Sequence, residues 1–287
     1  NNNSLFKQCN FLFLNISTPN YNKVNLSPSF DLNHTFLKKA LHFFTIIIVF
    51  HSTLTLPLMR KLIMSFADKK LSEIAVSVPG STSLLRKYDL DFCCGGSDTL
   101  AHAAAEKGLN VAEIETRLTE LQNSKAENPE EYWVNATYPE IIDHILVRYH
   151  QRHREQLQEL IVLADRVESV HGDREDCPMG VAAELRNVYE DLSNHMMKEE
   201  HVLFPMIKAG NYMMAQMPIR MMEMEHAEHG EHLDVLKSLT NNMTPPADAC
   251  NTWRALYSGI QEFADDLMMH IHRENNILFP RVIAENH

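Results

Sequence analysis

Two stretches of this chain, HMMKEEHVLFP at 195–205 and HIHRENNILFP at 270–280, repeat one pattern. Each places a Glu four residues after a His and continues to Phe-Pro five residues beyond that Glu. Side chains at positions i and i+4 lie on the same face of an α-helix. Each stretch therefore predicts a helix that presents a His and a Glu side by side. The duplication indicates that the two copies act together.

The repeat extends to a second pair of segments. HQRHREQLQEL at 150–160 aligns with HAEHGEHLDVL at 226–236, and the two share His-x2-His-x-Glu-x-Leu. Each of these segments precedes its own His-x3-Glu by a nearly equal stretch of chain. Four matching motifs in the same order predict two similar helix hairpins, each contributing a His from its first helix and a His and a Glu from its second.

Four long helical patterns surround these motifs. The first opens on a capping box formed by Thr137 and Glu140, with Pro139 in the first turn. The segments between the patterns are rich in Gly, Pro, Asn and Asp, which favour turns. The predicted helices cover about 137–169, 179–208, 214–240 and 249–278. Long helices with short connections predict an all-α protein with an up-down-up-down four-helix bundle at 137–287.

A smaller helical domain is expected at 64–125, followed by the polar linker QNSKAENPEEYWVNA. Its segment SDTLAHAAAEKG predicts a compact helix with Ser97 or Asp98 as the N-cap and Gly108 as the left-handed stop. The adjacent thiols of Cys93 and Cys94 precede this helix. The sequence thus predicts a small Cys-Cys-containing domain in front of the bundle.

The first 63 residues differ in composition from the rest. Nine Asn occur before position 34, and no helical or alternating period is present. The apolar stretch from Phe43 to Phe50 is too short to span a bilayer, which takes about 20 residues. We interpret 1–63 as an upstream-translated or dispensable extension and expect the working protein to start near Met64, without a membrane anchor.

Charge and cysteine content limit the classes of function. Residues 1–63 carry a net charge of +5, so the remainder carries −17 of the overall −12. An acidic body repels phosphate backbones, and nucleic acid is therefore not expected as a partner. Five cysteines form no recognisable disulfide framework. Free thiols predict a reducing, cytoplasmic location.

The repeated His and Glu fall on apolar stripes of their helices. A His or Glu buried in a bundle core is costly unless something pairs it. The stripes are Leu185, Val188, Leu192, His195, Glu199 and Val202 on one helix and Tyr257, Ile260, Ala264, Leu267, His270, Glu274 and Ile277 on the other. By the same periodicity, His201 and His272 point away from the stripes and are expected to face solvent.

The first helix of each hairpin offers two candidates. His150 and His153 border the same stripe, and His226 and His229 do so in the second hairpin. Periodicity does not choose within either pair, although the repeat predicts the same choice in both halves. One His from each helix and two Glu give six ligands aimed at the centre of the bundle.

Six such ligands exceed what a tetrahedral zinc site uses. Imidazole and carboxylate without thiolate favour iron or manganese, and two carboxylates can bridge two metals. Ferritin-type bundles use Glu-x-x-His, whereas this chain uses His-x3-Glu with a His-rich ligand set. The arrangement is therefore typical of a haemerythrin-like centre.

Together with YDLDFCCGGSDTL at 88–100, these motifs make residues 64–287 resemble the RIC (repair of iron centres) family of bacterial iron–sulfur cluster repair proteins. The resemblance implies a centre of two non-haem iron ions, bridged by Glu199 and Glu274 and by an oxo or hydroxo group. The ligands it implies are His150, His195, Glu199, His226, His270 and Glu274. It also implies donation of iron to iron–sulfur clusters damaged by nitric oxide or peroxide, with the damaged proteins as partners.

One departure bears on the function. Oxygen-carrying haemerythrins have a His-x3-His pair on the third helix, whereas the residue four after His226 is Gly230. A lost ligand leaves room for an exogenous ligand or makes iron easier to release, which favours repair over oxygen storage. The alternatives are a sensor that binds nitric oxide or oxygen and a di-iron nitric oxide reductase.

Four further residues are candidates for supporting roles. Asp191 lies one turn before His195, and Glu225 precedes His226, so either carboxylate could support a metal-bound His or line a substrate channel. Cys93 and Cys94 are candidates for a redox or metal-handing pair. Because a disulfide between adjacent cysteines is strained, an interface between two protomers of a homodimer is another interpretation.

Overall fold

The structure is a computed structural model that describes residues 65–124 and 126–285. Every regular element in these ranges is helical, and one isolated bridge pairs Lys70 with Thr99. The all-α prediction is confirmed. No helix of the described ranges is long and apolar enough to cross a membrane. The prediction for 1–63 lies outside the described residues.

The N-terminal part folds as a cluster of short helices around Ile74, Leu85, Leu100 and Ile114, which are fully buried. The elements are η1 (Phe66–Asp68), α3 (Leu71–Ser77), α4 (Ser81–Lys87), α5 (Leu100–Glu106) and α6 (Val111–Asn123). The expected helix at SDTLAHAAAEKG is α5, and Gly108 adopts the expected left-handed conformation with φ of 64°.

The predicted N-cap of α5 is wrong, because the cap is Thr99 and not Ser97 or Asp98. The Thr99 side chain accepts from the backbone N–H of His102. Backbone hydrogen bonds from Leu71 to the Asp98 carbonyl and from Leu100 to the Lys69 carbonyl hold this stretch extended. The helix therefore starts one or two residues later than the local sequence suggests.

The expected polar linker contains a helix, α7 (Pro129–Asn135), which packs against α3. Asn128 caps it by accepting from the N–H of Glu130, and Pro129 occupies the first turn, where no N–H is needed. Glu130 is buried and pairs with the buried Arg273 of the bundle. This linker is therefore an ordered connection to the bundle.

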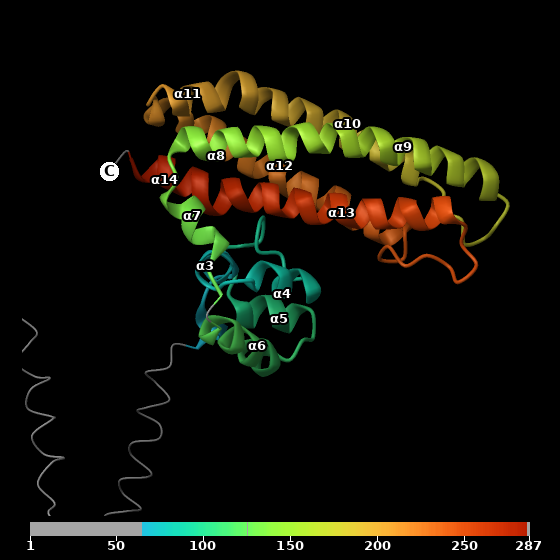
Figure 1. The fold of residues 1–287 in the computed structure, drawn as a ribbon, viewed down its shortest axis with the longest axis horizontal. Helices are drawn as coiled ribbons and strands as arrows, with labels where there is room; N and C mark the ends of the chain where they lie inside the picture. Colours follow the sequence, from blue (N-terminus) through green and yellow to red (C-terminus); the bar gives the residue numbers. More distant parts are fainter. Residues whose placement is uncertain (1–64, 125, 286–287) are drawn as a thin grey trace, which may run out of the picture. The chain divides into compact units, whose positions relative to one another are not determined.

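The four expected long helices are present and lie side by side (Figure 1). Several consist of consecutive α and π segments. The elements are α8 (Tyr138–His144), η2 (Ile145–His150), α9 (Gln151–His171), α10 (Val181–Lys198), η3 (Glu199–Leu203), α11 (Phe204–Lys208), α12 (Tyr212–Leu239), α13 (Asn251–Arg273), η4 (Glu274–Leu278) and α14 (Phe279–Ala284). The capping box of Thr137 and Glu140 is formed as expected.

The π segments change the register of the helices at the repeated motifs. Because a π turn closes i→i+5 hydrogen bonds, it rotates the following residues relative to the α period. Val202, expected on the buried stripe, is 43% exposed, and its neighbour Leu203 is buried instead. The Phe-Pro sequences do not end their helices, since α11 and α14 continue beyond them with Pro205 and Pro280 in the first turn after the π segment.

The bundle core consists of two apolar clusters. One contains Leu157, Leu192, Leu233 and Leu267 among its members. The other contains residues nearer the opposite end of each helix, including Ile145, Phe204, Met222, Ile277 and Phe279. Along the helices, His150, Glu199, His226 and Glu274 fall between the two clusters, and His195 and His270 lie at the border of the first. Apolar side chains therefore separate these polar groups from water at both ends.

Candidate metal centre

The six residues of the predicted ligand set meet in the interior of the bundle. Each has at most 1% of its surface exposed. They come from six elements: His150 ends η2, His195 lies on α10, Glu199 begins η3, His226 lies on α12, His270 lies on α13 and Glu274 begins η4. The π segments thus place a ligand candidate at their ends, where the change of register turns the side chain inward.

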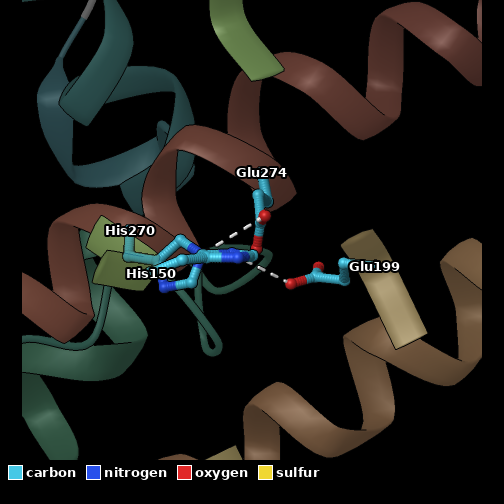
Figure 2. Close-up of side chains that lie close together, drawn as sticks. All are labelled: His150, Glu199, His270 and Glu274. Carbon is cyan, nitrogen blue, oxygen red and sulfur yellow. Dashed lines mark hydrogen bonds and ion pairs between the residues drawn. The ribbon is translucent and has the colours of Figure 1, made fainter. Parts of the chain in front are cut away.

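One half of the cluster contains His150 and His270 (Figure 2). Their Nε2 atoms are 3.2 Å apart. The Nε2 of His150 lies 3.3 Å from Oε2 of Glu199, and that of His270 lies 3.3 Å from Oε1 of Glu274. Figure 2 shows the two imidazoles facing carboxylates that come from different helices.

The other half contains His195 and His226, whose Nε2 atoms are 3.1 Å apart. The Nε2 of His195 lies 3.4 Å from Oε2 of Glu199, and that of His226 lies 3.1 Å from Oε2 of Glu274. Each half is therefore a set of four residues able to hold a metal ion, and Glu199 and Glu274 belong to both sets.

The donor atoms fit two cations. Nitrogen and oxygen ligands about 2.1 Å from a first-row divalent ion lie roughly 3.0–3.4 Å from one another around it. The contacts between donors, 3.1 to 3.4 Å, fall in this range. All four carboxylate oxygens are buried and accept no hydrogen bond. Two buried carboxylates without hydrogen bonds are very costly unless cations neutralise them.

Three of the four imidazoles are oriented by acceptors at their outer nitrogen. The Nδ1 atoms of His150, His195 and His226 lie 2.8, 2.9 and 2.8 Å from oxygens of Glu200, Glu225 and Asn275. These oxygens require N–H donors, so Nδ1 carries the proton and the Nε2 lone pair faces the cluster, as in metal-bound histidines.

His270 differs from the other three. Its Nδ1 is buried without a hydrogen-bond partner. Its ring is instead stacked on Tyr149, with centroids 5.3 Å apart and 13° between the planes. Tyr149 directly precedes His150, as Glu225 directly precedes His226. The two hairpins therefore support corresponding histidines by different means.

Two of the acceptors, Glu200 and Asn275, were missed by the sequence analysis. Each directly follows a repeated Glu, and each reaches the His on the first helix of its own hairpin. Glu200 also accepts from Arg154 at 2.8 Å. Their equivalent position in the repeat was the signal that could have found them.

The two carboxylates expected to support a metal-bound histidine, Glu225 and Asp191, have different partners in the structure. Glu225 reaches His195 and also pairs with Lys198. Asp191 is 57% exposed and pairs with His232 at 3.1 Å instead. One turn before His195, its side chain lies on the outer face of α10. The prediction that Asp191 supports a histidine of the cluster is therefore not met by its contacts.

The alternative candidates, His153 and His229, lie beside the cluster. His153 and His229 are buried, but neither belongs to a four-residue set. Their rings lie 5.3 Å from His270 and 4.9 Å from His195, respectively, and both Nε2 atoms are without a hydrogen-bond partner. The geometry thus selects His150 and His226 as the candidates.

The expectation that His201 and His272 face solvent is half right. His201 is exposed, as predicted. His272 is fully buried, so that prediction is wrong. Its ring packs edge-on against Phe92 at 5.4 Å, and its Nδ1 is 2.8 Å from Nδ2 of Asn276. A loop of the N-terminal part of the chain covers His272 through Phe92, which bundle periodicity alone could not reveal.

The adjacent cysteines lie close to the cluster. Both are free thiols with their sulfurs 3.8 Å apart, and Cys93 is buried. The thiol of Cys94 donates to the backbone carbonyl of His226 at 3.2 Å. A Cβ placed on Gly230 would lie 3.9 Å from this sulfur. The small residue that replaces the additional haemerythrin ligand thus lies against Cys94.

Electrostatics of the cluster favour cationic occupants. Burial disfavours a charged imidazole, but the carboxylates of Glu199 and Glu200 beside its two ring nitrogens outweigh it and raise the pKa of His150 to about 9. Burial is likewise outweighed by Glu274, so that the pKa of His226 also rises to about 9. The hydrogen bond from His195, together with Lys198, lowers the pKa of Glu225 to about 2. Without metal, protons hold the positive charge that the carboxylates require.

We expect the metal-free protein to lose stability between pH 6.5 and 9. The pKa values of His150 and His226, about 9, lie above the ordinary value of 6.5. Their stabilising contribution is therefore complete below pH 6.5 and is lost as the pH rises through 9, by up to about 1.4 kcal/mol per pH unit for each histidine. Urea unfolding of metal-free protein at the two pH values measures this.

Metal-loaded protein is the control for this prediction. In this protein a cation takes the place of the protons on His150 and His226. Its affinity for the metal should rise from pH 6.5 to 9, because fewer protons compete for the imidazoles. A metal-free protein whose free energy of unfolding stays constant or increases from pH 6.5 to 9 would contradict the assignment of these protons.

A four-helix bundle with buried, duplicated His/Glu sets between its helices defines the class of haemerythrin-like cation-binding proteins. Residues 141–282 match the family described as the Hemerythrin HHE cation binding domain. Residues 67–122 match ScdA_N, described as a domain of unknown function (DUF542).

Curated relatives carry the comparison further. The chain is 67% identical over 222 residues to the probable iron-sulfur cluster repair protein of Haemophilus influenzae, covering 77% of this chain and 100% of that protein. It is 54% identical to the iron-sulfur cluster repair protein YtfE of Musicola paradisiaca and 55% to that of Citrobacter koseri, covering 77% of this chain and 98% and 99% of those proteins. The chain therefore belongs to the RIC family of iron–sulfur cluster repair proteins, as its motifs indicated.

Proposed function

We propose that the six-residue cluster holds two iron ions, bridged by Glu199 and Glu274, and that the chain repairs damaged iron–sulfur clusters by donating iron. The observation that carries the proposal is the pair of four-residue sets with both carboxylates in common. The relatives named as iron-sulfur cluster repair proteins support the same role. Proteins with damaged clusters in the cytoplasm are the proposed recipients.

The ligand count supports release. Each set offers two imidazoles and two shared carboxylates, whereas iron commonly takes up to six ligands with N and O donors. The remaining positions are free for exchangeable groups. Bound iron would supply one-electron chemistry and open positions for small ligands such as nitric oxide. Two observations favour an iron donor over an oxygen carrier. A relative that matches 77% of this chain is named a probable iron-sulfur cluster repair protein, and Gly230 offers no side-chain ligand.

The protein's own groups assist release by exchanging charge. When a cation leaves, His150 and His226 can each take up a proton at Nε2, because their pKa values in the metal-free protein are about 9. Glu200 and Asn275 accept from the outer Nδ1–H of these rings, so the added proton goes to Nε2. The buried carboxylates are therefore never left facing neutral imidazoles only, which lowers the cost of the emptied site.

The proposal is tested by repair in vitro. Ferrous protein is incubated anaerobically with an enzyme whose [4Fe–4S] cluster has been damaged by nitric oxide or peroxide, in the presence of a chelator that captures free iron. We expect the enzyme's activity to recover with wild-type protein and not with Glu199→Gln. Recovery no greater than with metal-free protein would contradict the proposal.

The same preparation separates the alternatives. Steady consumption of nitric oxide with an electron donor, without cluster repair, would identify a reductase. Reversible binding of nitric oxide or oxygen with neither repair nor turnover would identify a sensor. In either case, a cluster that holds two iron ions would remain, while the donor role would be withdrawn.

A further inference from the structure

Asn275 lies between the metal cluster and the N-terminal helices. Its Oδ1 accepts from Nδ1–H of His226 at 2.8 Å. Its Nδ2 donates to the backbone carbonyl of Cys93 at 2.9 Å. One side chain thus joins a candidate metal ligand to the segment 91–96, which carries both adjacent cysteines and is called the thiol loop here.

The amide group is the chemical feature that makes this link. An amide both accepts and donates, whereas an ionised carboxylate only accepts. The equivalent position in the first hairpin is Glu200, whose carboxylate accepts from His150 and from Arg154 and donates to nothing. The repeat therefore differs at a position where the thiol loop meets the bundle, and Asn275 fits both of its partners.

Two further contacts hold the thiol loop on the same surface. The thiol of Cys94 donates to the carbonyl of His226, so the loop contacts this residue through its backbone as well. Asn276 donates to the carbonyl of Phe92 at 2.8 Å, and the other hydrogen-bond partner of its amide is His272, which is not a member of the cluster. Asn276 anchors the loop independently of the metal site, which makes it a natural control.

We propose that Asn275 is a positioning residue that couples metal occupancy at His226 to the docking of the thiol loop. This rests on the proposed metal centre. A cation held at Nε2 would fix the imidazole of His226 and polarise its Nδ1–H, and that N–H would in turn orient the amide of Asn275 toward Cys93. Loss of the cation would leave the His226 ring less restrained and would weaken the hydrogen bond from Asn275 to the carbonyl of Cys93.

The coupling is reciprocal, because it is a free energy shared by two sites. A docked thiol loop holds Asn275 in the orientation that supports His226 and so favours retention of the cation in that half. An undocked loop weakens retention there. The half with His150 and His270 lacks such a link, so the two metal positions respond differently to loop movement.

Hydrogen exchange of the full chain tests the coupling, with amide exchange of peptides covering the thiol loop measured with and without added Fe²⁺ under anaerobic conditions. In the wild type, iron should slow exchange of this segment by roughly fivefold to tenfold, the effect of about one hydrogen bond. In Asn275→Asp, the carboxylate still accepts from His226 but cannot donate to Cys93. The effect of iron on the loop should therefore disappear in the iron-loaded variant, with iron content measured on the same samples.

Two matched variants complete the design. Asn276→Ala should speed exchange of the loop in both states and leave the ratio between them unchanged. A Cys93→Ser, Cys94→Ser variant should keep the effect of iron, because Asn275 binds the backbone carbonyl and not the thiol. If this variant loses the effect, direct binding of iron to the thiols explains it and the proposal is overturned.

The remaining outcomes would overturn either the role of Asn275 or the metal centre itself. An effect of iron retained in Asn275→Asp overturns the role of Asn275, as does wild-type protein that binds iron without any change in the loop. Protein that takes up no iron at all would instead overturn the metal centre on which the inference rests, and metal analysis of the same samples distinguishes the two failures.

Discussion

Changing Glu199 to Gln is expected to remove both of the proposed metal ions from the protein. Glu199 faces His150 in one set and His195 in the other, so its carboxylate belongs to both. Gln keeps the size of the side chain but removes the negative charge and replaces one carboxylate oxygen by an amide NH₂, which cannot bind a cation. Metal content per chain, measured on purified protein, should fall from two to near zero.

Comparison with a histidine variant makes the result specific. His150 belongs to a single set, so His150→Ala should reduce metal content by about one ion and leave the other half occupied. Glu228→Gln, at an exposed position of α12, should leave both ions bound. If Glu199→Gln keeps one ion, the two sites do not share this carboxylate.

The second large effect is expected on stability. The carboxylate of Glu130 and the guanidinium of Arg273 are 5% and 3% exposed and pair with each other inside the protein. Glu130→Ala leaves the cation of Arg273 buried without its partner, which costs about 3–5 kcal/mol. Thermal unfolding should shift down by roughly 10 °C for a chain of this size.

An exposed ion pair of the same chain is the control. Arg186 and Asp165 are each about half exposed, at 51% and 50%. Asp165→Ala should cost no more than about 1 kcal/mol, because solvent screens this pair. The double change Glu130→Leu with Arg273→Met should recover much of the loss, since it removes both charges. Equal effects of Glu130→Ala and Asp165→Ala would contradict the buried role of Glu130.

Much of the candidate site could be predicted because helical periodicity is a local property. His195 with Glu199 and His270 with Glu274 fall on apolar stripes, and a stripe requires only the α period. The capping box at Thr137 and the presence of four long helices follow from equally local signals, although the fourth continues to Ala284, beyond its expected end at 278. The choice between His150 and His153 needed either the family resemblance or the structure, because both residues border the same stripe.

The rest depends on contacts between distant segments. His272 is buried because Phe92 packs on it, and the sequence pattern of the bundle helices does not predict that contact. Val202 is exposed because a π segment intervenes, a distortion that the α period does not foresee. Thr99 caps α5 because residues 69–71 pair with its neighbourhood. Asn275 acquires its second partner only when the thiol loop docks.

The most direct test of the dinuclear centre is an anomalous diffraction map, recorded at the iron edge from crystals of iron-loaded protein. The geometry predicts two peaks inside the bundle, one between His150 and His270 and the other between His195 and His226, each also in contact with Glu199 and Glu274. A single peak, or iron bound at Cys93 and Cys94 in place of this cluster, would contradict it.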